Sequence, residues 1–121
     1  MSLLEDAGSW GGFKEYIDIE SGLGRVMNNK KIYSSILKSF LGSSYFEEMR
    51  TQIQSNDLEN AERSAHTIKG VAANLSLTAL YETSVLIEKQ LKEGSDTGQT
   101  LIDMEFILNE TKKSIENLIA E

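Results

Sequence analysis

The sequence predicts an all-α protein, an up-and-down antiparallel four-helix bundle with one or two additional short helices at its N-terminal end. Three observations support this prediction. The 121 residues contain no proline, which is the strongest helix breaker. Apolar residues recur at alternating spacings of three and four along most of the chain, and no stretch shows the alternation typical of strands. A bundle buries such stripes, and a chain of this length has room for one core.

The composition narrows the classes of function. A net charge of −7 disfavours binding to nucleic acid phosphates or to an anionic membrane surface. No apolar run approaches the roughly 20 residues needed to span a bilayer, so we expect no membrane contact by this domain. The chain has no cysteine, which excludes disulfides and thiolate ligands and fits a cytoplasmic protein.

The first part of the chain divides into an arm and the start of the bundle. Residues 1–15 are rich in glycine and are expected to form a flexible or loosely packed arm, with Trp10 as a packing anchor. Residues 16–121 are expected to form the helical domain, beginning with a short helical turn near residues 21–27. A firmer helix is predicted over residues 30–42, with the apolar positions Ile32, Tyr33, Ile36, Leu37, Phe40 and Leu41.

A second, shorter helix is predicted directly after Gly42. Ser43 or Ser44 can cap its first turn. Its inner face is expected to hold the apolar residues Tyr45, Phe46, Met49 and Ile53.

The second half of the chain predicts three longer helices. The first spans residues 58–75, begins after Asn56 and Asp57, and has its apolar stripe at Leu58, Ala61, Ala65, Ile68, Ala72 and Leu75. A turn near residue 77, with Ser76 or Thr78 as a cap, leads into a helix that ends near Gly94. The inward positions of this helix and of the last helix are Leu77, Leu80, Ser84, Ile87 and Leu91, and then Leu101, Met104, Leu108, Thr111, Ile115 and Leu118.

The only histidine of the chain stands out on this background. At about 100° per residue, His66 lies on the side of its helix away from the apolar stripe, so the imidazole is expected to reach solvent. Gly70 follows four residues later on the same face, where glycine costs a helix about 1 kcal/mol relative to alanine. The missing side chain leaves space over the imidazole for a bulky group on another protein. Lys69 can bring its ammonium to the same place and offset the charge of a transferring phosphoryl group.

A carboxylate from the neighbouring helix is predicted to orient this ring. With the turn centred near residue 77, Glu88 lies opposite His66, because both are eleven positions from the centre. Its carboxylate could accept the Nδ1–H and leave the Nε2 lone pair outward as a nucleophile. The alternative is a surface glutamate paired with Lys92.

These residues resemble a known family. His66-Thr67-Ile68-Lys69-Gly70 is similar to the H-x-x-K-G signature of histidine-containing phosphotransfer (HPt) domains, and similar elements extend the resemblance over roughly residues 16–120. The resemblance implies a four-helix core, His66 as phosphoryl acceptor, and Lys69 and Gly70 as its helpers. It also implies a polar residue at position 88 that holds the imidazole. Many relatives have glutamine at that position, and many have glycine where this chain has Ser76.

The mechanism implied by the resemblance is phosphoryl transfer in a multistep two-component phosphorelay. His66 would accept the group from a receiver-domain aspartate of a response regulator and pass it to another receiver. The chain would be a phosphoryl carrier rather than an enzyme, without a nucleotide site or cofactor of its own, and magnesium is expected on the receiver. The docking face is expected to include Arg63, Ala73 and Asn74. A sensor histidine kinase is a further possible partner or parent protein, and we expect a monomer.

Two rival functions use the same bundle. A di-iron enzyme needs Glu-x-x-His pairs, whereas this chain has one histidine and places Arg63 three residues before it. That rival fails for lack of ligands. A helical adaptor or dimerisation module without phosphoryl transfer remains open, and in it His66 would be incidental.

Overall fold

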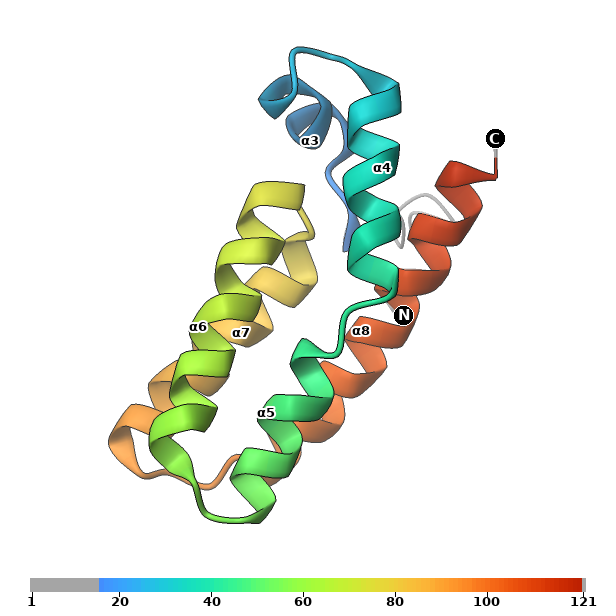
Figure 1. Ribbon diagram of the computed structural model, residues 1–121. Helices are drawn as coiled ribbons and strands as arrows, with labels where there is room; N and C mark the ends of the chain where they lie inside the picture. The colour runs from blue at the N-terminus through green and yellow to red at the C-terminus, as the bar shows by residue number, and fades with distance from the viewer. Residues whose placement is uncertain (1–15, 121) are drawn as a thin grey trace, which may run out of the picture.

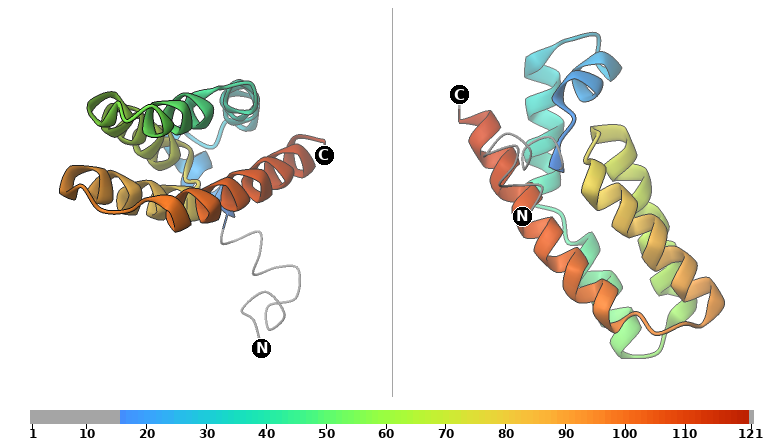
Figure 2. Two further views of the ribbon diagram at one scale, coloured as in Figure 1. Left: turned by 90° about the horizontal axis from the view of Figure 1, so that it is seen from below. Right: turned by 180° about the vertical axis from the view of Figure 1, so that it is seen from behind.

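The computed structural model describes residues 16–120, which are helical apart from short connections and contain no strand (Figure 1). The helices are α3 (Ile19–Arg25), α4 (Lys30–Leu41), α5 (Tyr45–Gln54), α6 (Leu58–Leu75), α7 (Thr78–Glu93) and α8 (Gly98–Ile119). Helices α4 and α5 follow one another as one broken rod, and α6, α7 and the long α8 alternate in direction beside it (Figures 1 and 2). The predicted all-α, up-and-down bundle is confirmed. The arm predicted over residues 1–15 lies outside the described residues.

The core consists of the inward faces of α4 to α8. Three alanines on α6, Ala61, Ala65 and Ala72, are completely buried and let it lie close to its neighbours α5 and α7. The largest fully buried apolar side chains come from α4, α5, α7, α8 and the connection before α7, and are Leu37, Met49, Leu77, Leu80, Ile87, Met104 and Ile115. Within the part of the chain that the structure describes, no helix has the length and apolar character needed to cross a membrane.

Three predicted core positions are wrong. Leu58 is 37% exposed because it stands in the first turn of α6, beyond the end of the core. Ile32 and Ile36 are 47% and 40% exposed. Helix α4 packs against α3, α6 and α8, and only the face that bears Tyr33, Leu37 and Phe40 is buried.

The helix ends follow the local sequence signals in part. The Asp57 side chain caps α6 by accepting from the backbone N–H of Asn60, as predicted. Ser44 occupies the predicted N-cap position of α5 but makes no side-chain cap hydrogen bond. The predicted Ser76 or Thr78 cap of α7 is wrong, because Leu77 holds the N-cap position and no side chain caps this helix. Instead, Ser76 ends α6 in the left-handed conformation with φ 58°, which is the conformation that glycine adopts most easily.

The segment before α4 and the first turn of α4 are tied to the C-terminal end of α6. The buried Tyr33 hydroxyl donates to the Leu75 carbonyl at 2.7 Å. The backbone N–H of Asp18 donates to the Ser76 carbonyl at 2.8 Å, and the Ser76 hydroxyl donates to the Ser21 hydroxyl at 3.0 Å. The bonds from Tyr33 and Asp18 satisfy the carbonyl groups of Leu75 and Ser76, which a helix end otherwise leaves without partners.

Because the Tyr33 phenol is buried, we expect the folded protein to lose stability at high pH. Burial, with a smaller effect of the Asp18 carboxylate, raises the pKa of Tyr33 from 10.0 to about 12. The stabilisation is complete below the pKa of the unfolded chain. As the pH rises from there through the folded pKa, the unfolded chain releases a proton that the folded chain keeps, so the free energy of unfolding falls.

Urea denaturation of the wild type and of Tyr33→Phe measures this loss. Between about pH 9 and pH 11.5 we expect the wild type to lose about 2 kcal/mol more than the variant. Parallel curves for the two proteins would contradict the assignment to Tyr33.

Candidate functional site

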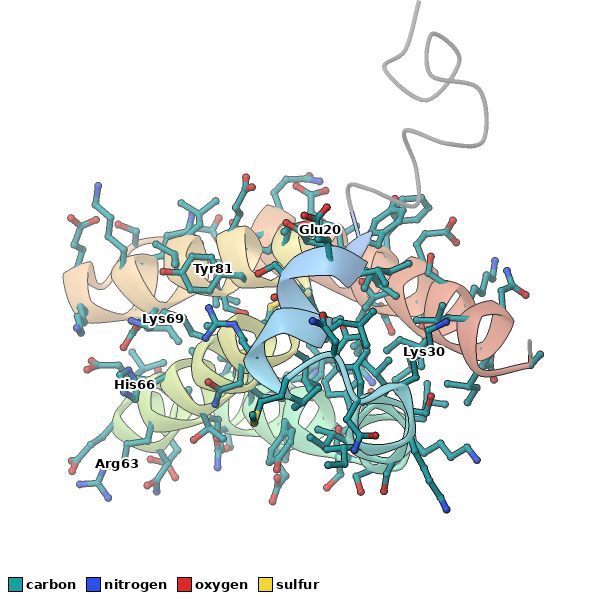
Figure 3. All side chains as sticks on the ribbon, turned by 90° about the horizontal axis from the view of Figure 1, so that it is seen from above. Glu20, Lys30, Arg63, His66, Lys69 and Tyr81 are labelled. Atoms are coloured by element: carbon teal, nitrogen blue, oxygen red, sulfur yellow. The ribbon has the colours of Figure 1, made fainter. Side chains whose placement is uncertain are left out.

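His66 projects from the exposed face of α6, as predicted. Its side chain is 69% exposed, and Arg63, Gly70 and Asn74 lie exposed on the same helix. Figure 3 shows Arg63 and His66 along the outer edge of the bundle, with Lys69 between α6 and α7. The apolar stripe places the opposite face of α6 in the core, so the sequence pattern itself turns this ring outward.

Glu88 approaches this ring from α7 and is nearly buried, with 7% of its side chain exposed. His66 Nδ1 lies 3.0 Å from Glu88 Oε2, and Lys69 Nζ lies 2.6 Å from the other carboxylate oxygen, Oε1. Lys92 Nζ is 3.8 Å from Oε2. The hairpin register therefore brings Glu88 to His66, and the alternative of an exposed glutamate paired only with Lys92 is wrong.

The charge state of Glu88 follows from these contacts. Burial alone would raise the pKa of its carboxyl group, but hydrogen bonds from Lys69 and His66 and the positive charges of Lys69 and Lys92 outweigh burial. The pKa of Glu88 is lowered below its ordinary value. Glu88 is therefore ionised at neutral pH and can only accept hydrogen bonds.

An ionised acceptor selects the tautomer of the ring. Because Glu88 cannot donate, His66 must carry a proton on Nδ1 to form the 3.0 Å bond. In the neutral imidazole this leaves the lone pair on Nε2. Among the described residues no side chain hydrogen-bonds Nε2, and the ring is exposed. The arrangement presents an oriented, accessible nitrogen nucleophile.

Lys69 and Gly70 follow His66 on α6 by three and four residues and so lie near this nitrogen along the helix. A Cβ placed on Gly70 would meet no atom within 4 Å outside its own helix backbone, so the surface beside His66 is open. Lys69 is 28% exposed, and its ammonium is held by Glu88 rather than by solvent. The ion pair between Lys69 and Glu88 was not predicted, because it depends on which way a long side chain turns.

The predicted docking residues differ in how exposed they are. Arg63 is exposed and pairs with Glu59 at 3.0 Å, Asn74 is exposed, and Ala73 is half-buried. Ala73 shares a surface depression with Tyr81 of α7, which is 40% exposed and is labelled in Figure 3. Tyr81 was not among the predicted docking residues, although an aromatic residue that falls off the apolar stripe of its helix is a usable signal for a contact surface.

The described residues hold no group of three or more histidine, cysteine, aspartate or glutamate side chains that could bind a metal ion. The cluster around His66 contains one carboxylate and two ammonium groups. Such a set of groups can support a nucleophile and stabilise the charge that develops beside it.

Comparison with known proteins identifies the family. The Hpt domain model matches residues 38–121, which include the helix of His66 and the helix of Glu88. No curated protein and no solved structure matches the chain. Hpt domains are phosphoryl carriers that work with receiver domains and kinases. Since the match covers more than half of the chain, this protein belongs to the Hpt domain family, whose members transfer phosphoryl groups through histidine in phosphorelays.

Proposed function

We propose that His66 accepts a phosphoryl group from the aspartyl phosphate of a receiver domain and passes it to a second receiver in a multistep phosphorelay. The observation that supports this most directly is the 3.0 Å contact between Nδ1 of an exposed histidine and a nearly buried, ionised Glu88. This contact fixes the ring and leaves Nε2 facing solvent.

The transfer proceeds by in-line attack. The Nε2 lone pair forms a bond to phosphorus while the bond between phosphorus and the aspartate oxygen breaks, and the electron pair of that bond stays on the aspartate carboxylate. Nδ1 keeps its proton, so positive charge develops on the ring and Glu88 stabilises it. Lys69 offsets the negative charge on the phosphoryl oxygens.

The receiver supplies what this chain lacks. Magnesium is expected in the receiver's acidic site, and this chain is expected to need no cofactor or nucleotide of its own. The receiver docks over the face that bears Arg63, Ala73 and Asn74, with Gly70 providing clearance. The protein is expected to act as a cytoplasmic monomer, either as a separate protein or within a hybrid sensor kinase.

Incubation with radiolabelled, phosphorylated receiver domains tests the function. A phosphoryl carrier should acquire a label that acid removes and base does not, as expected for phosphohistidine. It should pass that label to a second receiver. A chain that binds partners but takes no label from any of a broad set of receivers would instead be a helical adaptor or dimerisation module.

A longer side chain at Gly70 is expected to slow transfer selectively. Gly70→Gln fills the open surface beside His66 and should fold at least as well, since glycine is about 1 kcal/mol less favourable than alanine within a helix. Displacing the receiver by about 1 Å should slow transfer by about 10- to 100-fold. A time course of labelling for Gly70→Gln, with Gly70→Ala as the control, measures the rate of transfer.

A small phosphoryl donor distinguishes a loss of space for the receiver from a direct effect on the His66 imidazole. Phosphoramidate needs little clearance and should label wild type and Gly70→Gln at similar rates. Equal slowing with both donors would mean that the imidazole itself is perturbed. Unchanged transfer from the receiver would remove the argument for access at Gly70.

A further inference from the structure

Glu88 has one partner beyond those that the transfer mechanism uses. Lys92 lies one turn after Glu88 on α7, and its Nζ is 3.8 Å from Oε2, which is within ion-pair distance but too long for a hydrogen bond. Its side chain is 58% exposed, so its four-carbon stem is free to turn. Lys69, by contrast, is already in close contact with Glu88 at 2.6 Å.

Lys69 cannot serve two anions equally well. In the resting protein its ammonium is bound to Oε1 of Glu88. When a phosphoryl group with two negative charges arrives on Nε2, the same ammonium is drawn to the phosphoryl oxygens, since Lys69 stands three residues after His66 on the same helix. Any movement of Lys69 to the phosphoryl group therefore removes the closest cation from Glu88.

A nearly buried carboxylate without that cation is unfavourable. Glu88 is only 7% exposed, so solvent replaces a lost partner poorly. Such a group tends to take up a proton, and a protonated carboxyl holds the Nδ1–H of His66 less strongly. The ring would then lose its orientation at the stage when it carries the phosphoryl group.

We propose that Lys92 is a positioning residue that moves onto Glu88 when Lys69 turns to the phosphoryl group, and so keeps Glu88 ionised and the imidazole held. This inference rests on the phosphotransfer function proposed above. Lys92 needs to move by only about 1 Å to form a hydrogen bond, because 3.8 Å separates Nζ from Oε2 and a charged hydrogen bond is about 2.8 Å. A glutamate followed by a lysine four residues later is also the favourable order on a helix.

Three variants test the role of Lys92. Lys92→Met removes the ammonium and keeps the length of the side chain, and Lys92→Arg restores the charge. Lys89→Met is the matched control, because it makes the same change at an exposed lysine of α7. Lys89 forms no ion pair with any other described residue. The charged or titratable partners of Glu88 among the described residues are His66 and Lys69 from α6 and Lys92 from α7, and no charged group of α8 pairs with it.

Two measurements are made on each variant. The first is the pH dependence of transfer from a phosphorylated receiver, and the second is a carbon-13 NMR titration of the Glu88 carboxyl group. With Lys92→Met we expect the acidic limb of the rate profile to move to higher pH. Transfer at mildly acidic pH should then be about threefold slower, as for the loss of a partly exposed ion pair. The pKa of Glu88 should rise in the same variant.

The outcomes separate this proposal from the function on which it rests. Lys92→Arg should restore both readouts, and Lys89→Met should match the wild type. A profile and titration for Lys92→Met that match Lys89→Met would overturn the role of Lys92 and leave phosphotransfer intact. A wild type that takes no label would overturn both proposals together.

Discussion

His66→Gln is expected to abolish phosphoryl labelling completely while leaving the fold unchanged. Glutamine has no nucleophilic ring nitrogen, although its amide can still donate to Glu88. The side chain at this position is 69% exposed and contributes little to the core, so circular dichroism and the urea midpoint should stay at wild-type values. Because His66 is the only histidine among the 121 residues, no other imidazole can take over.

The test is to compare phosphoryl labelling of His66→Gln with that of a control variant, Asn109→Gln. Asn109 is an exposed residue of α8, so its replacement introduces the same side chain on a different helix. The control should label like the wild type. An acid-labile label that persists in His66→Gln would show that the acceptor is not a histidine, and would remove the proposed function.

Gly22→Ala is expected to produce the largest loss of stability of any small substitution in α3. A Cβ at this buried position would lie 2.7 Å from Cε1 of Tyr33 and still closer to Cζ and the hydroxyl oxygen. The ring is 3% exposed and its hydroxyl is bound to the Leu75 carbonyl, so it has little room to move. Overpacking costs about 1–3 kcal/mol, and an orphaned carbonyl adds about 1–3 kcal/mol.

The neighbouring Gly24 provides the matched control. A Cβ at Gly24 would meet nothing within 4 Å, and both glycines lie in α3. Gly24→Ala should therefore be neutral or slightly stabilising, because alanine is the better helix former. Urea denaturation should show the two variants shifted in opposite directions. A similar small shift for both would mean that Tyr33 moves aside without cost.

The parts of the fold that sequence reasoning predicted correctly are those fixed by local or periodic signals. Asp57 caps α6 and Gly94 ends α7 because these residue types suit those positions in any helix. The pairing of His66 with Glu88 could also be predicted from the sequence, since a tight turn fixes the register of an antiparallel helical hairpin. That register places the two side chains opposite one another, and their Nδ1 and Oε2 atoms lie 3.0 Å apart.

The parts that failed depend on relations between elements. Ile32 and Ile36 fit the apolar spacing of a helix, but only the tertiary position of α4 decides that one side of it is left exposed. The ion pair of Lys69 with Glu88 depends on how a flexible chain turns towards a neighbour, which helical spacing does not determine. Gly22 fell within the predicted short helical turn near residues 21–27 and was given no role there, and its role appears only once Tyr33 is placed over it.

The bonds between the segment before residue 38 and the end of α6 bear on where this domain begins as an independent folding unit. The family match starts at residue 38, within α4, yet the C-terminal carbonyls of the histidine-bearing helix are satisfied by Asp18 and Tyr33. A fragment trimmed to the family boundary would leave these carbonyls to water and bare the apolar end of α6. We therefore expect the unit that folds on its own to extend upstream of residue 38, so that recombinant boundaries are better drawn before α3.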